Sequence, residues 1–191
     1  MTLLKIAQIG HPVLRTRARE LSHDELMDDR MQRFIDDLVE TMRDANGAGL
    51  AAIQVYEPVR IVAIEVDNNP RYPYKPKIPL TILVNPVLMP ISTEVFDNFE
   101  GCLSVPNLRA VVPRFAAVRV SGWDRHGNVL EREVKGLSAG TFQHEVDHLD
   151  GVLFVDRVKD PTSFCTWAEF DRFHKQAFVD RIVPFIERMG G

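Results

Sequence analysis

Residues 141–151 read TFQHEVDHLDG, in which His144 and His148 lie four positions apart and Glu145 follows the first histidine. On an α-helix these histidines would be separated by about 40° and would therefore share one face. Neutral imidazoles are common metal ligands, and a carboxylate beside them can take the proton of an activated water molecule. Catalytic metal sites usually have three protein ligands and one open position, so the chemistry depends on a third ligand elsewhere in the chain.

The known types of H-E-x-x-H site differ in that third ligand. In metzincin proteases a third histidine follows at a fixed spacing; here Gly151 matches their pattern, but Phe154 stands in place of the histidine. Thermolysin-like proteases use a downstream glutamate, and Glu169 lies at a comparable distance. The upstream stretch FEGCLSVP offers Cys102, whose thiolate would also bind a metal ion. The residue types alone leave both Glu169 and Cys102 as candidates.

Three motifs in register resemble those of the peptide deformylases. They are GAGLAAIQ at 47–54, EGCLS at 100–104 and QHEVDHLDG at 143–151, and the resemblance, with GHPVLR and RAVVPR, runs from about residue 5 to 158. It implies hydrolysis of the N-formyl group from the formylmethionine of newly made polypeptides, with release of formate. The expected partners are therefore N-formylmethionyl nascent peptides, and the ribosome is a further candidate.

The resemblance also implies one divalent metal ion per chain, held by Cys102, His144 and His148. The expected ion is Fe²⁺, with Zn²⁺, Ni²⁺ or Co²⁺ able to replace it; one thiolate and two imidazoles would suit several of these ions. Glu145 is the expected general base and acid.

Further residues acquire roles through the same resemblance. The side-chain amide of Gln54 and the backbone N–H of Leu103 are expected to stabilise the oxyanion of the tetrahedral intermediate. Glu100 is expected to orient the loop before Cys102, and Arg114 and Asp147 to form an ion pair that supports the metal-binding helix. The expected substrate-binding residues are Gly47, Gly49, Arg109, Leu137, Gly140 and Thr141.

Periodicity along the chain indicates the elements that must position these residues. The segment from Ser22 to Asn46 predicts one amphipathic helix that begins with a capping box, Ser22 and Glu25. Short β-type runs at 59–66, 80–88, 116–123 and 128–134 predict strands, the last two joined by a hairpin loop. Residues 67–79, with four prolines, predict a surface loop, and the H-E-x-x-H helix is expected from about 138 to before 151.

The predicted fold class is α+β. Antiparallel β-sheets surround a central metal-binding helix that carries H-E-x-x-H, with an N-terminal amphipathic helix and a C-terminal helix. We expect one catalytic domain over 1–191, with a helical extension from about 160 that Pro184 interrupts. The aromatic residues of this extension are expected to pack back on the domain, or else to form an interface, so that the chain is a monomer or a homodimer.

The bulk composition excludes several classes of protein. Hydrophobic residues make up 45% of the 191 residues and the net charge is −4, which argues against a specific nucleic-acid partner. No apolar run is long enough to span a bilayer, and the two cysteines do not suggest a disulfide scaffold. The expected location is the cytoplasm, or an organelle if a transit peptide has been removed.

Overall fold

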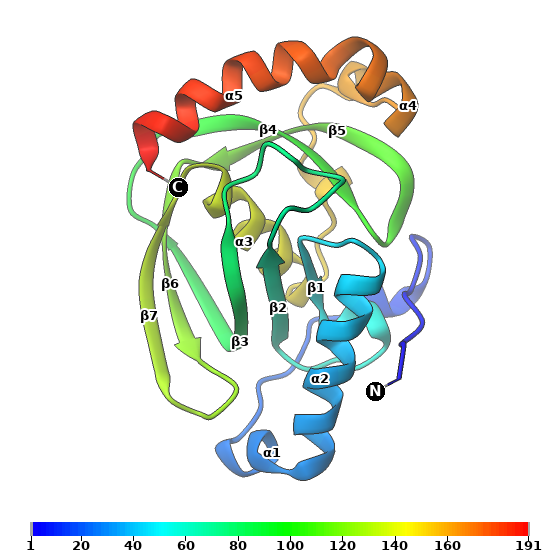
Figure 1. Ribbon diagram of the computed structural model, residues 1–191. Coiled ribbons are helices and arrows are strands. Elements are labelled where there is room, and N and C mark those ends of the chain that lie inside the picture. Colours follow the sequence, from blue (N-terminus) through cyan, green and yellow to red (C-terminus); the bar gives the residue numbers. More distant parts are fainter. Residues whose placement is uncertain (1, 191) are drawn as a thin grey trace.

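The computed structural model describes residues 2–190, which form two antiparallel β-sheets around one central helix (Figure 1). The larger sheet has the order β1-β2-β3-β6-β7, formed by Gly49–Ala51, Ile61–Val66, Ile78–Pro90, Ala117–Trp123 and Val129–Lys135. The smaller sheet is a hairpin of β4 (Val95–Cys102) and β5 (Val105–Phe115). The helices are α1 (His23–Met27), α2 (Asp29–Asp44), α3 (Gly136–Leu149), α4 (Trp167–Glu169) and α5 (Lys175–Met189). The predicted α+β class is confirmed.

Strand β2 shows why the large sheet has a helix on each face. Ile61 and Ala63 point to one face and belong to the hydrophobic cluster that includes α2. Val62 and Ile64 alternate with them and belong to the cluster that includes Phe142 of α3. Because successive strand side chains point to opposite faces, a run of apolar residues is the pattern of a strand buried on both sides.

The predicted N-terminal helix is two helices rather than one. The capping box is present, since Ser22 Oγ accepts from Glu25 N at 3.2 Å and Glu25 accepts from Ser22 N at 2.8 Å. Asp28 then leaves the helical conformation and accepts from Arg30 N at 2.8 Å, so it caps a second helix. The aspartate side chain replaces the helical partner of that backbone group, which the apolar periodicity alone does not reveal.

The hairpin β4–β5 crosses the top of the molecule beneath α5, and α3 lies below it (Figure 1). Phe96 and Phe99 of β4 pack with Phe170, Phe178 and Ile182 of the C-terminal segment. The expectation that this segment packs back on the domain is therefore met for its buried residues.

Pro184 does not interrupt α5, which continues to Met189, so that expectation was wrong. Phe178 and Ile182, on the buried face of the helix, hold it against the hairpin, and the loss of one backbone donor at Pro184 does not end it.

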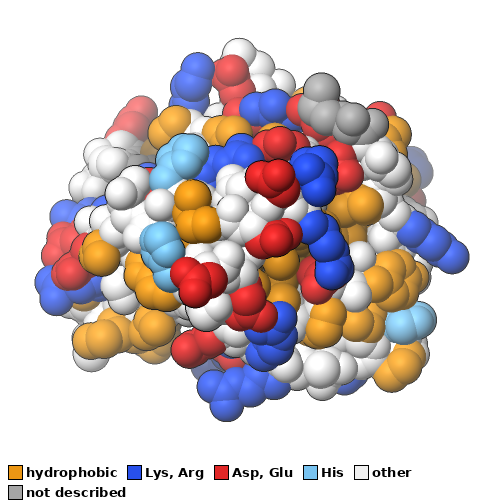
Figure 2. All heavy atoms as spheres, turned by 90° about the horizontal axis from the view of Figure 1, so that it is seen from below, with side chains coloured by type: hydrophobic (Ala, Val, Ile, Leu, Met, Phe, Trp, Pro, Cys, Tyr) orange, Lys and Arg blue, Asp and Glu red, His pale blue; other side chains and the backbone are white. Residues whose placement is uncertain are grey.

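Surface charge and helix composition bear on binding to nucleic acids and membranes. The face shown in Figure 2 carries acidic and basic side chains side by side rather than charges of one sign. In residues 2–190 none of the helices combines the length and the apolar character required to cross a membrane.

Candidate active site

Helix α3 and the end of β4 bring three metal-binding side chains together. His144 and His148 lie on one face of α3, and Cys102 is the last residue of β4. Their ligand atoms all lie within 4.8 Å of one another, and Cys102 Sγ is 3.3 Å from His148 Nε2. Helix α3 begins at Gly136, two residues earlier than expected, and the turn after it contains Gly151 at φ 73°. A Cβ at Gly151 would lie 2.9 Å from the Arg15 backbone, so this turn needs glycine.

Glu145 lies beside this cluster and against strand β1. A Cβ on Gly49 would stand 2.5 Å from the Glu145 carboxylate, so only glycine permits the strand to pass so close. Burial raises the pKa of Glu145 to about 7, and its Oε2 has no hydrogen-bond partner among the described residues. A buried carboxyl group with a pKa near neutrality is suited to accept and return a proton.

Gln54 is held so that its amide group faces the cluster. Its Oε1 accepts from Ala51 N at 2.8 Å, and its Nε2 lies 3.0 Å from Ser104 Oγ and 3.6 Å from Cys102 Sγ. A cavity lies beside the cluster, and Leu103, the residue after Cys102, lines it. The Cδ1 of Leu103 would lie 3.0 Å from a Cβ on Gly47. The Gln54 amide donor and the Leu103 backbone therefore both lie beside Cys102.

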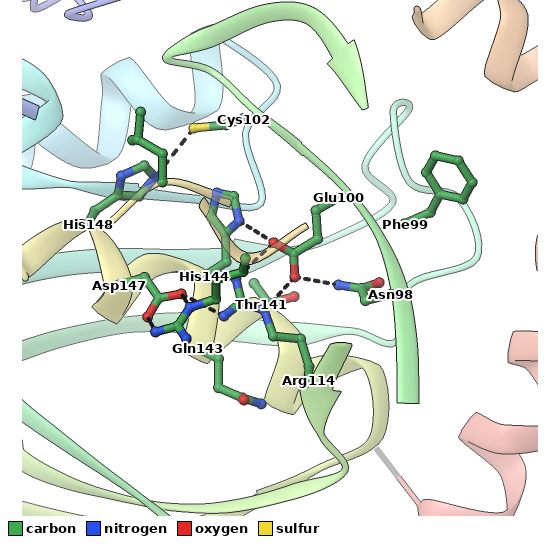
Figure 3. A network of polar contacts seen from close by, with 12 residues as sticks. Asn98, Phe99, Glu100, Cys102, Arg114, Thr141, Gln143, His144, Asp147 and His148 are labelled. Carbon is green, nitrogen blue, oxygen red and sulfur yellow. Dashed lines mark hydrogen bonds and ion pairs between the residues drawn. The ribbon is translucent and has the colours of Figure 1, made fainter. Parts of the chain in front are cut away.

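A buried ion-pair network supports the metal-binding helix (Figure 3). Arg114 donates to both Glu100 oxygens, at 2.7 and 2.9 Å, and to Asp147 Oδ2 at 2.6 Å, so the predicted Arg114–Asp147 contact is present. Glu100 Oε2 also lies 2.8 Å from His144 Nδ1, which leaves Nε2 of that ring available to a metal ion. Burial alone would raise the pKa of Glu100, but Arg114 lowers it well below its usual range. Glu100 thus orients the His144 ring, a more direct role than the loop support expected from the sequence.

We predict that Arg114→Met destabilises the protein by about 3–5 kcal/mol, because it leaves the Glu100 carboxylate buried without its counter-ion. Both side chains of that pair are 3% exposed. Denaturant unfolding measures the change, and Arg119→Met is the control, since Arg119 pairs with Glu133 on the surface. A loss below about 1 kcal/mol for Arg114→Met would contradict the prediction, whereas the control should change stability by no more than about 0.5 kcal/mol.

The described residues fit a divalent metal ion. The donor set of one sulfur and two imidazole nitrogens is a common one for transition metals. Burial lowers the pKa of His148 well below its usual value, so this ring is neutral, as a ligand must be. Burial also opposes protonation of His144, yet hydrogen bonds with Cys102 and Glu100 raise its pKa well above normal. Cys102 and Glu100 therefore favour a positive charge at His144, which a bound metal ion would supply.

The rival third ligand is not part of the cluster. Glu169 lies on α4 with its side chain exposed, and the metal-ligand grouping found in residues 2–190 contains Cys102 instead. Phe154, which occupies the place of the metzincin histidine, stacks on His144 at 6.3 Å between ring centres. The structure thus places Cys102, and not Glu169, beside the two histidines.

The substrate-binding residues expected from the sequence fall into two groups. Gly47, Gly49, Gly140 and Thr141 line a cavity beside the cluster. Leu137 is fully buried in a neighbouring hydrophobic cluster and does not line the cavity.

Arg109 also lies outside the cavity lining. It is fully buried, its guanidinium 3.8 Å from the Phe170 ring centre and 4.3 Å from that of Trp167. A substrate contact by Arg109 would require these aromatic side chains to move.

Sequence reasoning missed residues on the loop before β3 and on β4. Tyr72 and Lys75 of the proline-rich loop line the cavity, together with Asn98 of β4. The four prolines made the loop resemble an unpacked surface segment. The two tyrosines among these prolines, Tyr72 and Tyr74, were the local signal that the loop packs on the domain.

Comparisons with known proteins agree with this site. The family model described as polypeptide deformylase matches residues 3–164. The chain is 42% identical over 168 residues to peptide deformylase 2 of Nostoc sp., covering 88% of this chain and 93% of that one. A crystal structure of the class I type b peptide deformylase of Acinetobacter baumannii superposes with a TM-score of 0.80 at 37% identity, covering 83% of this chain and 100% of that one. The same enzyme with Met-Ala-Ser bound gives 0.79 at 38% identity, covering 82% and 99%.

Proposed function

Because this chain belongs to the polypeptide deformylase family, metallohydrolases that remove the N-formyl group from nascent peptides, we propose that Cys102, His144 and His148 hold the metal ion for that reaction. The observation that carries the proposal is the convergence of these three ligand atoms within 4.8 Å, beside a cavity that Cys102, His144 and Glu145 line. Three protein ligands leave one coordination position for chemistry.

We propose one divalent ion per chain, Fe²⁺ by resemblance to the family. A bound ion would lower the pKa of a water molecule, which would supply a hydroxide nucleophile at neutral pH, and it would also polarise the formyl carbonyl. The thiolate of Cys102 brings a negative charge to the site, so the residues around the ion carry more of the electrostatic stabilisation. Metal analysis of anaerobically purified protein, beside its deformylation rate, identifies the ion.

The remaining steps belong to the side chains. Glu145 accepts the proton of the attacking water and then delivers it to the leaving amine, a role that its raised pKa supports. The Gln54 amide and the Leu103 backbone N–H donate to the oxygen that becomes negative as the tetrahedral intermediate forms. Support for Gln54 comes from the Ala51 N–H, which fixes the amide with its NH₂ group toward Cys102.

The peptide backbone is proposed to bind beside strand β1. This strand is at the edge of the larger sheet, and within residues 2–190 β2 is its one strand partner, so an extended peptide can pair along its other edge. Gly47 and Gly49 keep that approach open, and Gly140 and Thr141 are proposed to contact the first side chain. Leu137 is proposed to support the substrate cavity from behind its lining residues. Arg109 is proposed to reach the substrate when Trp167 moves.

An enzyme of nascent chains works close to ribosomes, so the ribosome and the cytoplasm are the partner and the compartment that we propose. A homodimer is the alternative to a monomer, and sedimentation of the intact chain at micromolar concentration distinguishes the two. One catalytic domain with a helical extension from about residue 160 is the proposed organisation.

The direct test is formate release from formyl-Met-Ala-Ser by protein loaded with Fe²⁺ under anaerobic conditions. We expect turnover well above that of the metal-free protein. Metal-loaded protein that binds one equivalent of metal and releases no formate would refute the proposed function.

A further inference from the structure

The cavity beside the metal-ligand cluster is lined in part by polar side chains. Thr141 contributes a hydroxyl group, Asn98 an amide and Lys75 an ammonium group. A pocket that selects a methionine side chain by apolar contact alone has no need of these groups. Their presence indicates that the first side chain of the substrate meets hydrogen-bonding groups.

Lys75 is held in this lining by contacts on two sides. Its Nζ donates to Thr141 Oγ1 at 2.8 Å and lies 4.7 Å from the centre of the Tyr72 ring. The Thr141 hydroxyl in turn donates to Leu137 O at 3.4 Å, so its lone pairs face the lysine. Burial lowers the pKa of Lys75 to about 8, a value at which the amine still carries its proton at neutral pH.

The ammonium group has donors to spare. It has three N–H bonds, and Thr141 Oγ1 is its one hydrogen-bond acceptor among residues 2–190. No carboxylate in that part of the chain lies within ion-pair distance of Nζ; the Lys77 amine, two residues later, instead pairs with Asp67 on the surface. Lys75 is partly buried, and its free donors beside the cavity can be satisfied by an acceptor on the substrate.

The charges around Lys75 favour an uncharged acceptor. Glu145 and Glu100 both line the same cavity, although Arg114 already pairs with Glu100. Arg71 also lines it, and its guanidinium lies 4.6 Å from the centre of the Trp167 ring. A carboxylate on the substrate side chain would therefore be repelled by Glu145, whereas a neutral oxygen would not. A Cβ at Gly140 would stand 3.1 Å from Asn98 Nδ2 and from the Phe96 ring, so glycine at this position lets the Asn98 amide lie close against α3.

We propose that Lys75 determines specificity by donating a hydrogen bond to an uncharged oxygen at the end of the substrate's first side chain, and that the enzyme therefore accepts formyl peptides that begin with methionine sulfoxide. This inference rests on the proposed function. Methionine sulfoxide has nearly the shape of methionine and adds one strong acceptor, whereas the thioether of methionine is a weak one.

The experiment compares formate release from formyl-Met-Ala-Ser and from the same peptide with methionine sulfoxide. The enzymes are the Fe²⁺-loaded wild type, Lys75→Met and the control Lys77→Met. We expect the ratio of kcat/KM for sulfoxide over thioether to fall about tenfold in Lys75→Met, the effect of losing one charge-assisted hydrogen bond, mainly through KM. The ratio should be unchanged in Lys77→Met.

Two outcomes overturn the inference. One is an equal substrate ratio in Lys75→Met and the wild type. The other needs no variant: a wild-type enzyme that processes the methionine peptide but releases no measurable formate from the sulfoxide peptide. Failure of the wild type on both peptides would instead refute the proposed function, so the two failures are distinguishable.

Discussion

Replacing Cys102 with alanine is expected to abolish metal retention and, with it, deformylation. Cys102 Sγ lies 3.3 Å from His148 Nε2, and the three ligand atoms share a site within 4.8 Å. The variant keeps only two imidazoles, which leave the ion with too few protein ligands to stay bound. Metal content after gel filtration, measured per chain, should fall from about one equivalent to nearly zero.

Cys165→Ala is the matched control for this experiment. Cys165, like Cys102, forms no disulfide within residues 2–190. It belongs to the C-terminal segment, where its backbone pairs with Arg109 of β5, and it lies outside the metal-ligand grouping. Its replacement should leave one metal equivalent in place. If Cys102→Ala kept its metal and its activity, the cysteine would not be a ligand and a different third ligand would have to be sought.

Replacing Glu145 with glutamine is expected to reduce kcat for formate release by a factor on the order of 10²–10⁴ while the metal stays bound. Glutamine has nearly the same shape and so keeps the close packing against Gly49. It has no basic oxygen, so the attacking water keeps its proton and the leaving amine receives none. Metal analysis and the rate, measured on the same sample, separate this loss from a loss of the ion.

Glu169→Gln serves as the control for the glutamate. Glu169 lies exposed on α4, and a thermolysin-type site would have used it as a ligand. Its replacement should change neither metal content nor rate. A Glu145→Gln enzyme with near wild-type kcat would exclude Glu145 as the proton carrier. Loss of the metal in Glu169→Gln would instead support a thermolysin-type site with Glu169 as the third ligand.

Local sequence patterns predicted much of the fold. The strands that become β2, β3, β6 and β7 follow from short β-branched runs, and the metal-binding helix follows from its apolar face and the glycine at its end. The hairpin β4–β5 was not predicted, although it carries Cys102, because its residues mix polar and apolar types. That hairpin is buried between α3 and the C-terminal segment, and such burial is a property of contacts distant in sequence.

The contribution of the C-terminal segment likewise depends on tertiary contacts. The Arg109 backbone exchanges hydrogen bonds with Cys165, at 2.8 and 2.9 Å, and this pairing lays Trp167 over the arginine. A Cβ on Gly101 would lie 3.0 Å from the Trp167 ring, so the segment sits directly on the strand that leads to Cys102. Nothing in the local sequence of either segment states that they meet.

The sequence by itself placed the proposed ligands His144 and His148 and the proposed proton carrier Glu145 together, because helical spacing over five residues sets their positions. The choice of Cys102 over Glu169 followed in the sequence from motif resemblance, and the structure supplied a physical reason, since the end of β4 brings the Cys102 thiol to the two histidines of α3. The tertiary structure alone decided what surrounds the metal. It brought Lys75 from a proline-rich loop to Thr141, and Glu100 to His144, through contacts that span 66 and 44 residues. Spacing along a helix can be read locally, whereas the walls of a cavity exist only after distant segments have packed together.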